Sequence, residues 1–276
     1  MIALIDADIL TYRCGFAVQK SITHTDESGE EIGSSLEVEP VSHALQLIKT
    51  TIRNILEETE ATSHELYLTA DDKSNFRFKV AKTKPYKGNR IAPRPVHYAA
   101  IREYLVEVCD AKVIHGIEAD DKLGIRQVEI YNSLPTTNDE GMSVIVSIDK
   151  DLRQIPGLHY NFVTKEFFAC NKEGSLELSQ DRRKLTGGGH KFFFAQMLLG
   201  DNADNIPGVP GYGPVKVYQQ LIKRNSFDEL ARVVYSIYKE EKIQERFLEI
   251  ADLLWIQQYE DDRISDVLKL SLETFK

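Results

Sequence analysis

The sequence predicts an α/β fold in which a mostly parallel central sheet is flanked by helices and followed by a helical region. Up to about residue 185, short apolar segments alternate with segments of helical periodicity, as in parallel sheets covered on both faces. From about residue 186 the pattern is helical only. With 276 residues, 42% of them hydrophobic, the chain is long enough for an α/β core over residues 1–185 and a helical region over residues 186–276.

Each expected element follows from its local pattern. Strands are expected at 2–6, 65–70, 111–116 and 143–148, with short strands at 159–163 and 166–170. Helices are expected at 41–59, 96–109 and 118–131, and again from 186 to about 259. The polar, glycine-containing segment 22–38 indicates an exposed loop or hairpin. Prolines interrupt the basic segment 73–94, so this part of an expected arch over residues 77–109 is predicted to be irregular.

The charges are unevenly distributed, although the net charge is −9. From Lys73 to Arg102 there are nine lysines and arginines and no acidic residue. A basic segment set against acidic clusters suits a protein that holds phosphate in one place and metal in another. Three widely spaced cysteines form no zinc or disulfide pattern, and no apolar run approaches the roughly 20 residues of a membrane span. We therefore expect a cytoplasmic protein with no membrane partner.

Carboxylates follow the expected strand ends. Asp6, Asp71 and Asp149 lie at or just after strands, and Glu118 follows another closely. Because the carboxyl ends of parallel strands meet at one edge of the sheet, we expect these side chains to converge. Any one of these acidic motifs is a weak signal, since acids also cap helices and Asp-rich turns are common.

The whole acidic set indicates a metal site. Its members are Asp6, Asp71, Glu118, Asp120, Asp121, Asp149, Asp151, Asp201 and Asp204. Such a concentration of anions is costly without cations, and hard divalent ions with oxygen ligands relieve that cost. We predict two Mg²⁺ ions, replaceable by Mn²⁺, that support phosphodiester hydrolysis. A Ca²⁺ buffer is the structural alternative, but the sequence has no EF-hand loop.

Two further segments are candidates for DNA contact. The basic segment offers Arg77, Lys84, Tyr86, Lys87 and Arg90, with the tyrosine suited to stacking on an unpaired base. On charge alone a solvated cationic loop is the alternative. The loop 208–213 (GVPGYG) joins two helical stretches, and its glycines leave N–H groups free to approach phosphate; its candidates are Gly208, Gly211, Gly213 and Lys216. A plain interhelical turn is the alternative there.

These motifs, in the order in which they occur along the chain, resemble those of the 5′-nuclease family, which includes flap endonucleases, phage 5′→3′ exonucleases and the 5′-nuclease domain of bacterial DNA polymerase I. The resemblance covers about residues 2–221 and rests on Asp6, Asp71 with NFR at 75–77, YKGNR at 86–90, EADD at 118–121, DKD at 149–151 and GDNADNIPGVPGYG at 200–213. It implies a PIN-like or resolvase-like core and a C-terminal helix-three-turn-helix clamp of the helix-hairpin-helix type. In some members of the family that clamp also holds K⁺.

The resemblance also implies roles for individual residues. Asp71, Glu118, Asp120 and Asp121 would hold the first metal ion with Asp6 alongside, and Asp149, Asp151, Asp201 and Asp204 would hold the second. Lys87 and Arg90 would act on the scissile phosphate, and Tyr86 would stack on a base near it. Asp8 is an extra carboxylate, and the prolines at 91–95 argue against a regular arch helix.

The implied activity is structure-selective hydrolysis of DNA at 5′ flaps, free 5′ ends and branched duplex, leaving a 5′-phosphate and a 3′-hydroxyl. The length and short arch resemble the phage enzymes, so the host cytoplasm and a monomer are expected, and no sliding-clamp peptide is visible. Two other classes stay open: a non-catalytic branched-DNA-binding protein on the same fold, and a PIN-like ribonuclease. The full carboxylate set speaks against the first, and the loop 208–213 against the second.

Overall fold

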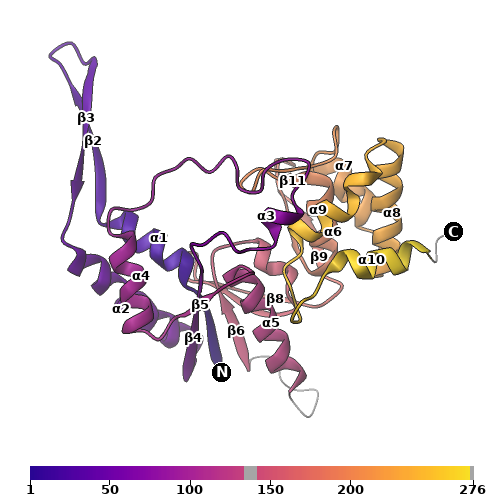
Figure 1. Cartoon of the computed structure of the whole chain (residues 1–276), viewed down its shortest axis with the longest axis horizontal. Coiled ribbons are helices and arrows are strands. Elements are labelled where there is room, and N and C mark those ends of the chain that lie inside the picture. Colours follow the sequence, from indigo (N-terminus) through magenta and orange to yellow (C-terminus); the bar gives the residue numbers. More distant parts are fainter. Residues whose placement is uncertain (134–141, 274–276) are drawn as a thin grey trace.

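The centre of the molecule is a six-stranded sheet with strand order β5-β4-β1-β6-β7-β8 (Figure 1). The computed structural model describes residues 1–133 and 142–273. All neighbouring strands are parallel except the antiparallel pair β7 and β8. The strands are β1 (Ile2–Asp6), β4 (Ser63–Thr69), β5 (Lys112–Ile114), β6 (Ser143–Val146), β7 (Gly157–Asn161) and β8 (Glu166–Cys170). The predicted mostly parallel sheet is therefore confirmed.

Helices cover both faces of this sheet because its central strands are apolar on both sides. In β1, Ala3 and Ile5 join a buried cluster with three helices, α1 (Ala7–Ala17), α2 (Val41–Thr59) and α4 (Tyr98–Glu107). Leu4 points the other way and packs in a cluster with α5 (Ala119–Asn132). The sequence reasoning missed α1, whose first turn carries Asp8.

The second region is built around one buried helix, α6 (Gly189–Leu199), in which every residue from Phe192 to Leu198 is buried. Around it lie α7 (Pro214–Leu221), α8 (Phe227–Glu240) and α9 (Phe247–Leu254), and α10 (Ile264–Glu273) packs against α8 and α9. Prediction and structure differ here in two respects. Helix α10 lies beyond the expected end at 259, and short strand pairs were missed: β9 (Ser175–Leu178) with β10 (Leu185–Gly188), and β11 (Gly200–Asp201) with β12 (Ile206–Pro207).

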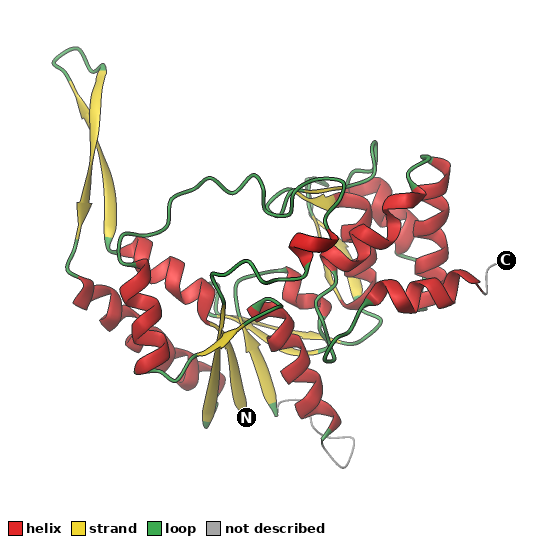
Figure 2. Ribbon diagram, in the orientation of Figure 1, coloured by secondary structure: helices red, strands yellow, loops and turns green. Residues whose placement is uncertain are grey.

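A long β-hairpin projects from the α/β core (Figures 1 and 2). Its strands β2 (Gln19–Thr25) and β3 (Glu31–Val38) pair with each other and with no other strand of the described residues, and they are almost wholly exposed. Of the two expectations for residues 22–38, a loop or a hairpin, the structure has the hairpin.

Within the range 77–109 expected for the arch, residues 81–97 form an irregular segment, which is called the arch below. They follow the short helix α3 (Arg77–Val80), precede α4 and contain no helix or strand, as the prolines predict. Figure 2 shows this segment as a loop that crosses from the helical region to the side of the core that carries α4 and the hairpin. Among the described residues, no helix is long and apolar enough to cross a membrane.

Candidate active site

The carboxyl edge of the sheet carries a buried aspartate at its centre. Asp6 ends β1 and caps α1 by accepting a hydrogen bond from the backbone N–H of Ile9, with N and Oδ1 3.2 Å apart. Its other oxygen accepts a hydrogen bond from the Ser147 hydroxyl at 2.9 Å, just beyond β6. The residue is 2% exposed. The end of β1 and the turn after β6 therefore fix this carboxylate between them.

Further carboxylates crowd around Asp6 and oppose one another's ionisation. Burial, with repulsion from Asp8, raises the pKa of Asp6 from its ordinary 3.8 to about 7. Asp120, in the first turn of α5, has its pKa raised well above 3.8 by burial and by repulsion from Asp6 and Asp149. The pKa of Asp149 is raised mainly by burial. Asp6, Asp120 and Asp149 therefore form one electrostatic unit.

A second set of carboxylates continues from Asp149. Burial, together with repulsion from Asp149 and Asp201, raises the pKa of Asp151 to about 8. Gln196 on α6 donates its side-chain amide to Asp151 Oδ1 at 2.6 Å. Asp201 Oδ1 accepts the backbone N–H of Ala203 at 2.7 Å, which fixes the turn after β11. Asp149 is common to both sets, so the acidic site has two adjacent halves.

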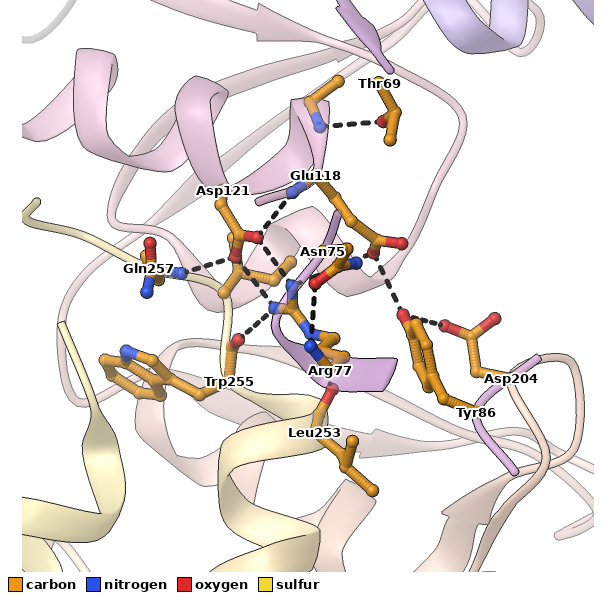
Figure 3. A network of polar contacts seen from close by, with 12 residues as sticks. Thr69, Asn75, Arg77, Tyr86, Glu118, Asp121, Asp204, Leu253, Trp255 and Gln257 are labelled. Carbon is orange, nitrogen blue, oxygen red and sulfur yellow. Dashed lines mark hydrogen bonds and ion pairs between the residues drawn. The ribbon is translucent and has the colours of Figure 1, made fainter. Parts of the chain in front are cut away.

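The base of the arch, residues 86–90, brings cations to this site. Lys87 pairs with Glu118, and Arg90 pairs with Asp204. The Tyr86 hydroxyl oxygen lies between two carboxylates, 3.0 Å from Glu118 Oε2 and 2.8 Å from Asp204 Oδ2, and can donate its proton to either (Figure 3). Burial alone would raise the pKa of Glu118, but the charges of Lys87 and Arg77 lower it to about 2. Glu118 and Asp204 are therefore neutralised by protein cations, unlike the buried aspartates beside them.

Lys87 is held in an unusual backbone conformation. Its φ is 54°, in the left-handed region that side-chain-bearing residues rarely occupy. Its backbone N–H donates to the carbonyl oxygen of Asp204 at 2.9 Å. Such strain persists only where surrounding contacts enforce it, and it is concentrated at functional sites.

Asp71 lies at the rim of the site. Its Oδ1 forms an ion pair with Arg94 Nη2 at 2.8 Å and accepts a hydrogen bond from the Tyr98 hydroxyl at 3.0 Å. The Asp71 side chain is 45% exposed. Arg102 lies 3.7 Å from Asp71 and 3.1 Å from Asp8, and so joins this rim to the buried cluster. Asp8, which was not in the predicted ligand set, also accepts the backbone N–H of Thr69 at 3.0 Å.

The predicted roles of Asp121 and Arg77 need correction. Asp121 is fully buried and forms a two-pronged ion pair with Arg77, at 2.6 and 2.8 Å (Figure 3). It also accepts the backbone N–H groups of Glu118 and Gln257 at 2.9 and 3.0 Å. These four hydrogen bonds saturate its oxygens, so Asp121 is not available as a metal ligand here. Arg77 is 3% exposed and therefore does not lie on a DNA-binding surface.

Tyr86 and Gly208 also differ from expectation. Tyr86 is 5% exposed and packs edge-on against Phe78, so its ring has no free face for a base. A Cβ at Gly208 would lie 2.3 Å from the Leu199 carbonyl oxygen, so this glycine serves close packing within the protein. At Gly211 and Gly213 an added Cβ would meet no atom within 4 Å, which leaves their backbone approachable. The duplex clamp at 208–213 remains a prediction.

The sequence reasoning missed a group of aromatic residues beside the rim. On α1, Tyr12 and Phe16 are 39% and 43% exposed, with ring centroids 6.2 Å apart. Tyr12 also lies 5.5 Å from Tyr98, over which the Arg94 guanidinium is placed at 4.3 Å. Tyr12 and Phe16 are one helical turn apart, a spacing that would have been informative had α1 been predicted.

The oxygen donors of this site fit a hydrated divalent ion. Within residues 1–133 and 142–273, no three histidine, cysteine, aspartate or glutamate side chains are arranged so that they could hold an ion by themselves. The available donors are carboxylate oxygens, which suit hard cations. Mg²⁺ typically keeps several of its waters and takes only one or two protein carboxylates directly. The site therefore fits a hydrated hard ion and does not fit a closed protein cage.

Asp120 and Asp121 are adjacent in sequence, but their substitution should change stability in opposite directions. In metal-free protein at pH 8, Asp120→Asn should raise Tm, because it removes a buried charge repelled by its neighbours. Asp121→Asn should lower the free energy of unfolding by about 3–5 kcal/mol, because it leaves the Arg77 charge buried without its partner. Thermal and urea unfolding of the two variants measure both effects. Shifts of the same sign would refute the distinct roles given to the two residues.

The raised pKa values predict how stability depends on pH. The pKa of Asp6 rises from 3.8 to about 7 and that of Asp151 from 3.8 to about 8. The protonated forms favour folding, so stability present below pH 4 is lost as pH rises through 7 to 8. In EDTA, Tm should fall by on the order of 5 °C between pH 5 and pH 8. Added Mg²⁺ should reverse the fall at pH 8 and have little effect at pH 5. A metal-free Tm that is flat or rising over this interval would contradict the prediction.

Comparison with known proteins gives relatives but no match to a family model. A 5′-3′ exonuclease of Buchnera aphidicola subsp. Schizaphis graminum is 29% identical over 248 residues, which cover 88% of this chain and 75% of that protein. The flap endonuclease Xni of Shewanella denitrificans is 26% identical over 209 residues, which cover 71% and 76%. The crystal structure of the T5 D15 protein with metal ions has a TM-score of 0.62 at 18% identity and covers 99% of this chain and 96% of that one, so the two share a fold. Over most of its length the chain is therefore similar to 5′-3′ exonucleases and flap endonucleases.

Proposed function

We propose that this protein is a divalent-metal-dependent 5′-nuclease that hydrolyses DNA at 5′ flaps, free 5′ ends and branched duplex, leaving a 5′-phosphate and a 3′-hydroxyl. The observation that carries the proposal is the position of two cations at the border of the buried carboxylates. Lys87 and Arg90 pair with Glu118 and Asp204 at the base of the arch. An anionic backbone that reaches this border meets protein cations on one side and a metal-binding surface on the other.

The buried aspartates would hold two hard divalent ions, Mg²⁺ or in its place Mn²⁺. Asp6, Asp120 and Asp149 belong to one half of the site, and Asp149, Asp151 and Asp201 to the other. When bound, the ions neutralise these carboxylates and stabilise the negative charge that develops on the phosphate oxygens. Asp71 and Asp204 would serve the two halves from the rim, where each already has an arginine partner. We also propose a K⁺ ion at the loop 208–213, and this part of the proposal rests on the resemblance to the family alone.

The protein groups bind and orient the DNA. Lys87 and Arg90 would contact the scissile phosphate and stabilise charge on it. Lys84 is exposed on the arch and would follow the backbone of a single strand. The approachable backbone at Gly211 and Gly213, with Lys216 on α7, would hold duplex without reading its sequence.

Base stacking is assigned to α1 in place of Tyr86. Tyr12 and Phe16 present exposed rings next to the rim that carries Asp71, whereas the Tyr86 ring is buried. Aromatic rings stack on any base, so such contacts hold an unpaired nucleotide without sequence preference. We propose that the terminal nucleotide stacks on this pair of rings.

The two other classes are less well supported. A non-catalytic DNA-binding protein gains nothing from buried aspartates that oppose one another's ionisation and weaken its fold at neutral pH. A PIN-like ribonuclease would not need the loop 208–213 with its approachable glycines. A cleavage assay separates all three: end-labelled 5′-flap, nicked, blunt and single-stranded DNA, with an RNA control, incubated with and without Mg²⁺.

Asp149→Asn should abolish Mg²⁺-dependent cleavage of the flap substrate while DNA binding persists, because the shared carboxylate of both metal halves is lost. Asp204→Asn should behave similarly. Product mapping on gels and binding measured by fluorescence anisotropy follow the two properties separately. Glu245→Ala, an exposed acid in the helical region, is the matched control and should cleave normally. Full activity in both Asn variants would overturn the two-metal assignment.

Lys87→Ala should slow the chemical step about 100-fold and weaken DNA affinity much less, since its charge acts mainly at the phosphate under attack. Single-turnover rates at saturating enzyme, compared with affinities, measure the two effects. Lys79→Ala, an exposed lysine on α3, should leave both unchanged. A single-turnover rate equal to wild type would remove Lys87 from the proposed mechanism.

A further inference from the structure

One carboxylate of the helical region holds the entry to the arch. Glu249 lies on α9, and its Oε1 accepts the backbone N–H groups of Lys82 and Thr83 at 2.7 and 2.6 Å. Its Oε2 accepts the Thr83 hydroxyl at 2.8 Å. These three hydrogen bonds orient the backbone itself at the point where α3 has ended and the arch begins. An ion pair between flexible side chains would not fix the main chain in this way.

The other end of the same short segment is held by the loop after β11. The side-chain amide of Asn205 donates to the carbonyl oxygen of Pro85 at 2.9 Å, and that of Asn89 donates to the carbonyl oxygen of Asn202 at 2.6 Å. Between these attachments lies Lys87, with its φ of 54° and its N–H bonded to Asp204. The left-handed conformation of Lys87 therefore depends on contacts at both ends of residues 82–90.

Helix α9, which carries Glu249, is itself fixed in position by burial and by a hydrogen bond to the α/β core. Phe247, Ile250 and Ala251 are buried in the core of the helical region, at 0–1% exposure. The carbonyl oxygen of Leu253, at the end of α9, accepts the Arg77 guanidinium at 3.0 Å, and Arg77 in turn holds Asp121 beneath the acidic site. The helix is therefore fixed to the α/β core a few residues beyond Glu249, and a displacement at Glu249 would pass directly to the arch.

We infer that Glu249 is a positioning residue of the nuclease: it holds the entry to the arch so that Lys87 and Arg90 face the scissile phosphate. This inference rests on the proposed function, and it assigns a role to a segment whose sequence shows no nuclease motif. Glu249 touches neither DNA nor metal in this account. Its effect is on where the two cations lie, and a displacement of about 1 Å in such groups can reduce a rate on the order of 100-fold.

The test compares Glu249→Ala with Glu249→Gln in the full chain, using steady-state cleavage of a 5′-flap substrate. The alanine variant should lower kcat about 10- to 100-fold with little change in KM or in Tm. The glutamine variant should retain nearly wild-type kcat, because its amide oxygen still accepts both N–H groups and its NH₂ can donate to the Thr83 hydroxyl. Glu245→Ala is the matched control on the same region. Equal kcat in wild type and Glu249→Ala would overturn the inference.

Coupling to Lys87 separates positioning from general loss of structure. In a Lys87→Ala background, Glu249→Ala should lower kcat by a smaller factor than in wild type, because one of the two groups that it positions is already absent. Independent, multiplicative losses would contradict the inference. If Glu249→Ala fails to fold, Thr83→Val carries the test: it removes only the hydroxyl bond and should lower kcat several-fold at unchanged Tm, with a wild-type kcat as the contradicting result. Absence of cleavage by the wild type would instead reject the proposed function.

Discussion

Mutual repulsion among buried carboxylates is the constraint around which the site is organised. Asp6, Asp120, Asp149 and Asp151 all have raised pKa values because they are buried, and each is also repelled by acidic neighbours. Parallel strands bring the first of these residues to one edge of the sheet, and α5 and the turn after β6 add the others. Such an arrangement opposes folding at neutral pH unless cations neutralise it. The fold therefore tolerates an unfavourable charge distribution where the chemistry requires one.

The surrounding cations divide the acidic residues into two kinds. Glu118, Asp204 and Asp71 have protein partners from the arch, whereas the deeper aspartates interact mainly with one another. Arg77 and Asp121 form a separate, wholly buried pair that joins α3, α5 and the segment after α9. Through this pair the helical region fixes Asp121 at the start of α5, and through Glu249 it fixes the entry to the arch. The two regions therefore cooperate in one site although their sequence patterns differ.

Much of the architecture could be predicted from the sequence, and the failures have physical reasons. Apolar runs such as 143–148 identify strands directly, and the carboxylates that follow them mark the edge of the sheet. Helix α1 was not predicted because its buried face includes Thr11 and Gly15, whereas the large rings of Tyr12 and Phe16 are exposed on the other side. Its sequence therefore lacks the one-sided apolar periodicity that identifies a surface helix. The short strand pairs of the helical region, of two to four residues each, are too brief to give an alternating pattern.

The candidate ligands could be found as a set but not sorted individually. Asp120 and Asp121 are neighbours at the start of α5, and the helix turns one toward the acidic cluster and the other toward Arg77. No feature of the EADD motif tells which is which. Likewise, the aromatic ring at 86 beside lysines suggests stacking, but its hydroxyl and ring are used within the protein. These outcomes depend on partners that are distant in sequence, at a separation of 44 residues for Arg77 and Asp121 and of 118 residues for Tyr86 and Asp204.

Proton release on metal binding tests the central claim most directly. If the deep aspartates are partly protonated near neutrality, Mg²⁺ must displace those protons when it binds. Titration calorimetry of DNA-free protein at pH 7, in buffers with different ionisation enthalpies, counts them. We expect release of about one proton or more per chain at pH 7 and much less at pH 9, where the carboxylates are already ionised. Mg²⁺ binding with no proton release at pH 7, or no Mg²⁺ binding at all, would contradict the account.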